Sequence, residues 1–410
     1  PPYYYLLYFA SLFDGVAPRL WLIKFVSIAF DIVAAVFAYR AVRLHFSHTR
    51  ALYAASALFA APTVILNGAW WGQCDIIWVS LILGSFYFTM AKRPLWAVML
   101  FGVALSFKAQ AFFLAPFLFL LFLRGELGLW RLALVPFVYA AMMVPAVLIG
   151  QSWGDVFSVY AHQAGHFNQL SLSAPNIYYF ISDEFYAIGV PIGLAVTAIA
   201  CAALGFLGRR ASLEPQGRTL AAAMFVALSV LLLPKMHDRY FFAADVFSIV
   251  LAFYAPRLWF VPVIFQISSL FAYVPNITFS LNGAASTDPL PTAAMLNTII
   301  VSYLIYSYWR ICKQPNDVIG TAALKPLCIA FATVVIGNAL WIALTYTSAA
   351  LSARYCPADG LMNFAVCSRN LPANVIYGTW RHYLIYALMF APAYVIARIA
   401  VGRIWKTKAA

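Results

Sequence analysis

Long uninterrupted apolar runs, separated by short polar segments, follow one another along almost the whole chain. The runs do not alternate apolar and polar residues, so they predict helices rather than the strands of a transmembrane β-barrel. The chain is therefore predicted to be an all-α polytopic integral membrane protein with about 11 to 13 transmembrane helices of about 20 residues each. The apolar runs cover residues 20–38, 51–66, 74–90, 95–123, 132–149, 187–207, 220–233, 241–254, 258–274, 293–309, 326–347 and 383–400.

Composition agrees with this pattern and excludes a soluble protein. Hydrophobic residues make up 64% and charged residues 10% of the 410 residues, whereas soluble domains average about 45–50% and about 25%. The net charge of +13 would suggest a nucleic-acid partner if it gathered in one patch. The basic residues lie mainly in short loops between apolar runs instead, so we expect a lipid bilayer as partner and no nucleic acid.

Alternate loops carry most of the basic residues, provided that residues 95–123 begin and end on one side. This segment is then a re-entrant or paired hairpin that breaks at residues 106–110. The positive-inside rule makes the basic face cytoplasmic and places residues 1–19, 67–74, 150–186, 234–240, 275–292 and 348–382 outside. The basic face contains Arg40, Arg43, Arg50, Lys92, Arg93, Arg124, Arg131, Arg209, Arg210, Arg218, Arg257, Arg310, Lys313, Lys325, Arg398, Arg403, Lys406 and Lys408.

The first residues indicate whether sequence precedes Pro1, and the cysteines indicate whether the outer loops lie in an oxidising compartment. The chain begins on the outer side without Met or a signal-like charged start, so we expect further sequence upstream of Pro1. Cys356 and Cys367 share one outer loop. In an oxidising compartment a disulfide there would stabilise the loop by about 2–4 kcal/mol; the alternative is two unrelated thiols.

Ionisable residues at membrane depth are costly and usually line a cavity or a site. Lys24 and Asp31 share one face of a predicted helix. Snorkelling to the interface explains Lys24. Asp31 lies mid-span and needs a partner from another helix, which makes a structural pair as plausible as a functional one.

A polar turn, NGAWWGQCD, separates two of the apolar runs. Its glycines permit a tight turn, and its tryptophans suit either an interfacial belt or a platform for stacking a sugar ring. The alternative is an aromatic anchor with a polar turn. The candidate site residues of this segment are Asn67, Trp70, Trp71, Gln73 and Asp75.

Two further segments concentrate cations. Lys108, with Gln110, interrupts a long apolar stretch, and a lysine there could neutralise a buried phosphate; snorkelling is the alternative. The segment PKMHDRY fits a phosphate head group because arginine binds phosphate bidentately and histidine donates or carries charge. Its alternative is a polar loop with an internal Asp238–Arg239 ion pair. Its candidate residues are Lys235, His237, Asp238 and Arg239.

Metal binding and nucleotide chemistry are less well supported. His162 and His166 have the spacing of a helical ligand pair, but no Glu or Cys stands beside them in ligand spacing. Residues 153–167 indicate an amphipathic helix on the membrane surface instead. The chain lacks a Walker motif, a Rossmann glycine signature and a serine-hydrolase elbow. We therefore expect neither a metal nor another cofactor.

Four motifs together resemble one family. PPYYYLLYF at the start, NGAWWGQCD, GVALSFKAQAFFLAPF and LLLPKMHDRYFFAAD are similar to the bacterial GPI-mannosyltransferase-like branch of the GT-C glycosyltransferases. They resemble more distantly the eukaryotic glucosyltransferases that extend lipid-linked N-glycan precursors. The resemblance covers residues 1–310 as a catalytic module and leaves residues 311–410 as C-terminal helices.

This resemblance implies a GT-C-like bundle in a bacterial inner membrane, with its site facing the periplasm. It implies metal-independent, inverting transfer of mannose or another sugar from a polyprenyl-phosphate donor to a glycan or glycolipid acceptor. Lys108 and the His237–Arg239 turn would lie near the donor phosphate. The family's catalytic aspartate would fall upstream of Pro1, with Asp75 and then Asp14 as substitute bases.

The chemistry fits these residues independently, because a phosphate leaving group needs cations more than a general acid. Two other functions remain open. A transporter or lipid flippase would also bury charges, but it predicts broken helices in both halves of the chain. A receptor or scaffold would not explain Lys108 and the PKMHDRY cluster.

Overall fold

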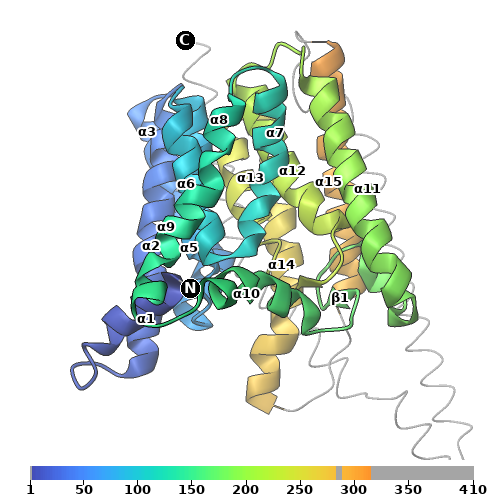
Figure 1. Ribbon diagram of the computed structural model, residues 1–410. Helices are drawn as coiled ribbons and strands as arrows, with labels where there is room; N and C mark the ends of the chain where they lie inside the picture. The colour runs from blue at the N-terminus through green and yellow to red at the C-terminus, as the bar shows by residue number, and fades with distance from the viewer. Residues whose placement is uncertain (1, 283–288, 315–410) are drawn as a thin grey trace, which may run out of the picture.

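Helices form over the long apolar runs, and the chain is mostly helical in the computed structural model, which describes residues 2–282 and 289–314 (Figure 1). The predicted Cys356–Cys367 disulfide and most of the C-terminal region lie outside the described residues. The elements are α1 (Pro2–Ser11), α2 (Arg19–Arg43), α3 (His48–Phe59), α4 (Pro62–Val64), η1 (Ile65–Trp70), α5 (Asp75–Met90), α6 (Pro94–Phe107), η2 (Ala109–Leu114), α7 (Ala115–Leu123), α8 (Leu129–Leu132), α9 (Leu134–Leu148), α10 (Trp153–Gly165), β1 (Ser171–Leu172), η3 (Ile177–Phe180), η4 (Asp183–Phe185), α11 (Tyr186–Gly208), α12 (Pro215–Leu232), β2 (Met236–His237), α13 (Phe242–Tyr254), η5 (Pro256–Leu258), α14 (Phe260–Asn282) and α15 (Leu290–Lys313).

Five described helices are long and apolar enough to cross a membrane, and a bent pair makes a sixth. They include α2, α11, α12 and α15. The central helices α12 and α13 are buried nearly all round, as expected of helices that are apolar on every face. The coarse prediction of an all-helical membrane protein therefore agrees with the structure.

Basic loops meet at one end of the bundle. The Arg124 guanidinium, just after α7, donates to the carbonyl oxygens of Gly208 at 3.0 Å and Ala211 at 2.7 Å, where α11 ends. Arg218, near the start of α12, pairs with Glu126. These contacts join the loops after α7 and α11 at the top of Figure 1.

The predicted break within residues 106–110 is confirmed. Helix α6 ends at Phe107, and Lys108 adopts an extended backbone with φ −157° and ψ 135° before η2 begins. A second interruption lies in the bent pair, where α3 meets α4 and η1 at 44°. Element η1 is a π-helix, a form that is common at functional sites.

Glycines allow η1 and the following turn to approach α2 closely. A Cβ atom on Gly68 would lie 3.3 Å from Ser27 Cβ and 3.4 Å from Asp31 Oδ2. Gly72 has φ +77°, a conformation that side chains other than glycine rarely adopt. The hydroxyl of Ser27 donates to the Gln73 carbonyl oxygen at 2.7 Å. The polar face of α2 therefore holds the turn that leads into α5.

At the opposite end of the bundle, two short strands join a loop to the segment between α12 and α13. We call this region, residues 150–186 and 233–241, the strand end. Strand β1 pairs in parallel with β2, and backbone bonds flank the pair, with Lys235 N donating to Leu170 O at 2.7 Å and Asp238 N to Leu172 O at 3.0 Å. The segment that carries His237 and Arg239 is therefore fixed by the preceding loop.

Candidate active site

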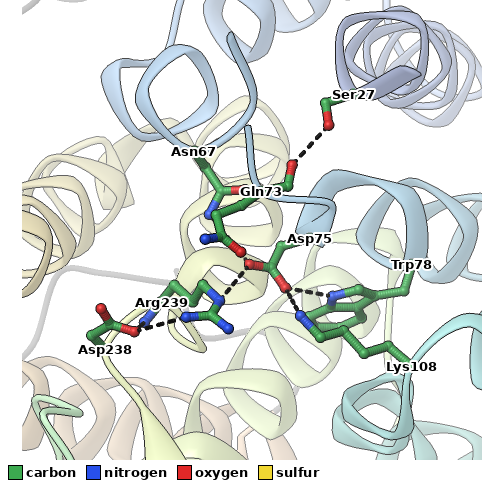
Figure 2. Close-up of polar contacts among 8 residues, drawn as sticks. All are labelled: Ser27, Asn67, Gln73, Asp75, Trp78, Lys108, Asp238 and Arg239. Carbon is green, nitrogen blue, oxygen red and sulfur yellow. Dashed lines mark hydrogen bonds and ion pairs between the residues drawn. The ribbon is translucent and has the colours of Figure 1, made fainter. Parts of the chain in front are cut away.

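Asp75 lies at the centre of the site, at the first position of α5. Its side chain has no solvent exposure, yet both of its oxygens accept polar contacts (Figure 2). Trp78 Nε1 donates to Oδ1 at 3.2 Å, and Asn67 Nδ2 donates to Oδ2 at 3.3 Å. A buried carboxylate needs such partners, because an unpaired charge is costly in a low-dielectric interior.

Two cations from distant parts of the chain complete this arrangement. Lys108 Nζ forms an ion pair with Asp75 Oδ1, and Arg239 Nε lies 3.3 Å from Asp75 Oδ2. Each oxygen of Asp75 thus binds one cation and one neutral donor. The predicted meeting of Lys108 with the His237–Arg239 turn is confirmed.

The two cations keep part of their surface free of protein. The exposed fraction is 22% for the Lys108 side chain and 21% for Arg239, against 0% for Asp75. An ammonium has three donors and a guanidinium has five, so Asp75 and Asp238, the carboxylates beside them, cannot occupy all of these donors. The remaining donors are available to an anionic ligand.

Aromatic rings flank both cations. Lys108 Nζ lies 5.8 Å from the Tyr240 ring centre, and Arg239 Cζ lies 5.9 Å from the Trp71 ring centre. Tyr273 packs edge-on against Trp71, with centroids 5.6 Å apart. Cations over aromatic faces gain electrostatic stabilisation, so these rings help to hold the cations in place.

The surroundings of the site shift the pKa values of Asp238 and His237 in opposite directions. Burial raises the pKa of Asp238 to about 6, although Arg239 opposes this shift. Asp238 Oδ1 accepts from the Arg239 backbone N–H at 2.9 Å and lies 3.3 Å from Arg239 Nη1. The internal ion pair that the sequence offers as an alternative is therefore present, in addition to the contact with Asp75.

His237 is a neutral imidazole at neutral pH. Burial, together with the nearby charges of Arg239 and Lys108, lowers its pKa to about 4. Its ring packs between Tyr240, with centroids 5.2 Å apart, and Phe167, with centroids 5.7 Å apart. A neutral imidazole offers one donor and one acceptor, so of the two roles that the sequence leaves open for His237 the lowered pKa favours hydrogen bonding over carrying charge.

The other candidates come from all three polar segments, and they differ in how they lie relative to the Asp75 cluster. The Gln73 side chain points toward the Asp75–Arg239 pair (Figure 2), and Gln110 lies beside the hydroxyl of Tyr240. Trp70 is 60% exposed, which favours the interfacial role for this tryptophan. Lys235 donates from Nζ to the hydroxyl of Tyr186, the first residue of α11, at 2.5 Å.

Of the three predicted aspartates Asp14, Asp31 and Asp75, only Asp75 pairs with Lys108 and Arg239. Asp14 lies in the loop between α1 and α2 and pairs with exposed Arg19 at 2.8 Å. Asp31 is buried against Gly68, and its Oδ1 has no hydrogen-bond partner among the described residues. Asp75 has both oxygens engaged by donors and cations, so its geometry favours a counter-ion over a substitute base.

Several contributing residues were not predicted. The side-chain nitrogen of Asn176 donates to Val230 O at 3.3 Å and to Leu233 O at 3.1 Å, which caps the end of α12. Asn297 donates from Nδ2 to Pro175 O at 2.9 Å. These fully buried amides fix the strand end. The only sequence signal for them is a polar residue within or beside an apolar run.

Comparison with known proteins adds no assignment. No family model matches the chain, and no curated protein matches it. The resemblance to GT-C glycosyltransferases therefore stays a prediction from four motifs, and the function has to be argued from the geometry of Asp75, Lys108 and Arg239.

Proposed function

We propose that this chain is a GT-C-type membrane glycosyltransferase. It moves mannose or another sugar from a polyprenyl-phosphate donor to a lipid-linked or glycan acceptor. The strand end faces the periplasm of a bacterial inner membrane, and the basic loops face the cytoplasm. The complete bundle has about 11 to 13 transmembrane helices, as the number of apolar runs suggests.

One observation carries the proposal. Lys108 and Arg239 converge on a single buried carboxylate and keep part of their donor surface exposed. Such an arrangement suits a phosphate, because charge-assisted hydrogen bonds to phosphate oxygens are strong and arginine can make two in parallel. The cations lie among apolar helices, where a lipid-linked phosphate can arrive sideways from the bilayer.

The residues support an inverting displacement. The acceptor hydroxyl oxygen forms a bond to the anomeric carbon of the donor as the bond from that carbon to the phosphate oxygen breaks. The bonding electrons leave with the phosphate, whose growing negative charge Lys108 and Arg239 stabilise. The acceptor proton goes to a carboxylate base other than Asp75. Asp75 holds the two cations in position and takes no proton.

The test is turnover by the purified protein in liposomes. Full-length protein, including any residues upstream of Pro1, is incubated with labelled polyprenyl-phosphate sugars and a panel of glycolipid acceptors, and the release of polyprenyl phosphate is measured. We expect release with at least one donor, and its loss in Lys108→Met and Arg239→Ala. Lys92→Met, which removes an exposed lysine in the turn between α5 and α6, is the matched control and should retain the wild-type rate.

The same assay separates the transporter alternative. Lipid that crosses the bilayer without cleavage of its sugar–phosphate bond would favour a flippase and contradict the proposal. Near-normal turnover in both cation variants would remove Lys108 and Arg239 from the site.

A further inference from the structure

Phe167 is an exposed aromatic residue that reaches the buried site through a line of ring contacts. It follows α10 and is 41% exposed, yet its ring packs edge-on against His237 at 5.7 Å. The His237 ring contacts Tyr240 at 5.2 Å, and Tyr240 lies 5.8 Å from Lys108 Nζ. The line therefore runs from the surface of the strand end to the cation that faces Asp75.

Polar groups border the same line. The Tyr186 hydroxyl donates to the Phe167 carbonyl oxygen at 3.3 Å, and Lys235 Nζ donates to that hydroxyl at 2.5 Å. His237, neutral at physiological pH, adds a ring nitrogen that donates and one that accepts. The partly exposed ring of Phe167 thus lies near hydrogen-bonding groups of Tyr186, Lys235 and His237.

A sugar ring fits this combination of groups. Its hydroxyls form hydrogen bonds at the rim, while its C–H face packs on aromatic rings. A phosphate held by Lys108 and Arg239 would place the attached sugar beside Tyr240 and His237, because the sugar is bonded directly to that phosphate. Phe167 then lies at the far edge of the ring.

We propose that Phe167 and His237 form the subsite that binds the transferred sugar of the donor. This inference rests on the proposed function, since it requires the donor phosphate at Lys108 and Arg239. In this subsite Phe167 packs on the apolar face of the sugar and His237 bonds one of its hydroxyls. Phe167 thereby affects which donors bind and leaves recognition of the lipid phosphate unchanged.

The test compares two lipids that differ only in the sugar. Binding of short-chain polyprenyl phosphate and of the same lipid carrying mannose is measured with the full chain in detergent, for wild type, Phe167→Ala and Phe167→Tyr. We expect Phe167→Ala to weaken binding of the mannosyl lipid by about 3- to 10-fold, the size of one aromatic contact, with binding of the bare lipid phosphate unchanged. Phe167→Tyr, which keeps the aromatic ring, should bind the mannosyl lipid with the wild-type affinity. If another sugar is the natural substrate, glucosyl and arabinosyl lipids replace the mannosyl lipid in the same comparison.

Phe180→Ala is the matched control, because Phe180 is an exposed phenylalanine (53%) of the same loop and its ring packs on Tyr179. It should leave both affinities unchanged. Equal losses for both lipids in Phe167→Ala, or equal effects of Phe167→Ala and Phe180→Ala, would show that Phe167 only anchors the loop in the interface and would overturn the sugar subsite. If wild type binds neither lipid, the proposed function fails, and the subsite fails with it.

Discussion

Asp75 is a carboxylate without solvent exposure that binds Lys108 through one oxygen and Arg239 through the other. Two neutral donors, from Trp78 and Asn67, complete its contacts. A buried ion pair gains little over an apolar replacement, but breaking it on one side is strongly destabilising. Substitution of Asp75, which pairs with both cations, should therefore destabilise the cluster more than substitution of either cation alone.

Replacing Asp75 by Asn should lower both stability and activity, because Lys108 and Arg239 then lose the carboxylate that they share and only Asp238 is left beside Arg239. Loss of one partner of a buried pair costs about 3–5 kcal/mol. Thermal unfolding in detergent, followed by tryptophan fluorescence, checks this, with exposed Asp155→Asn as control. The double variant Asp75→Asn/Lys108→Met should lose less stability than the sum of the two single variants. Strict additivity would show that the pair is not coupled.

Asp238 should make donor binding depend on pH. Burial raises its pKa to about 6, so as the pH falls from 7 to 5 the carboxylate gains a proton and the site gains one positive charge. A polyprenyl-phosphate sugar is a phosphodiester that does not titrate in this range, and its affinity should rise by up to about tenfold. Asp238→Asn should remove the dependence. His237, with a pKa of about 4, stays neutral throughout; a dependence that survives in Asp238→Asn would contradict this assignment.

At the scale of the elements, the break at Lys108 was predictable from the sequence and the strand pair was not. The basic residues of alternate loops fall on one face only if residues 95–123 begin and end on the same side, which predicts a break at residues 106–110. Strands β1 and β2 have two residues each, which is too short for any periodic signal. Their pairing, and the caps from Asn176 and Asn297, depend on tertiary contacts that the local sequence does not encode.

Packing between α11 and the strand end gives a test of this arrangement. A Cβ atom on Gly193 would lie 2.0 Å from the Tyr178 hydroxyl oxygen, so Gly193→Ala must displace η3 or α11. We expect a loss of about 1–3 kcal/mol in stability, as for other overpacked sites. Tyr178→Phe in the same chain removes the closest atom and should restore part of it. Gly165→Ala, with no atom within 4 Å of the added Cβ, is the control, and a melting temperature of Gly193→Ala equal to that control would contradict the packing.

At the scale of the whole molecule, basic loops meet at one end, and Arg239 of the candidate site belongs to the strand end. Arg124 links the loops after α7 and α11 at the basic end. The apolar runs and the charge of the loops predicted this division, because both follow from the cost of placing charge in hydrocarbon. They could not specify that Asp75 is the shared partner of both cations, since that depends on how three separate segments pack.

Orientation in the membrane can be tested by cysteine labelling. In a chain whose native cysteines are replaced by serine, Gln151→Cys at the strand end should react with a membrane-impermeant maleimide added to intact bacterial cells. Arg209→Cys at the basic end should react only after the membrane is permeabilised. Both residues are exposed, so access to the reagent depends on the side of the membrane. The reverse pattern would place the site on the cytoplasmic face.

A cryo-electron microscopy structure of the full chain with a bound polyprenyl-phosphate sugar tests the central claim most directly. We expect phosphate oxygens at about 3 Å from Lys108 Nζ and from the Arg239 guanidinium, with Asp75 still bridging the two cations. A phosphate bound elsewhere, with Lys108 and Arg239 contacting only protein, would show that these cations do not bind the donor.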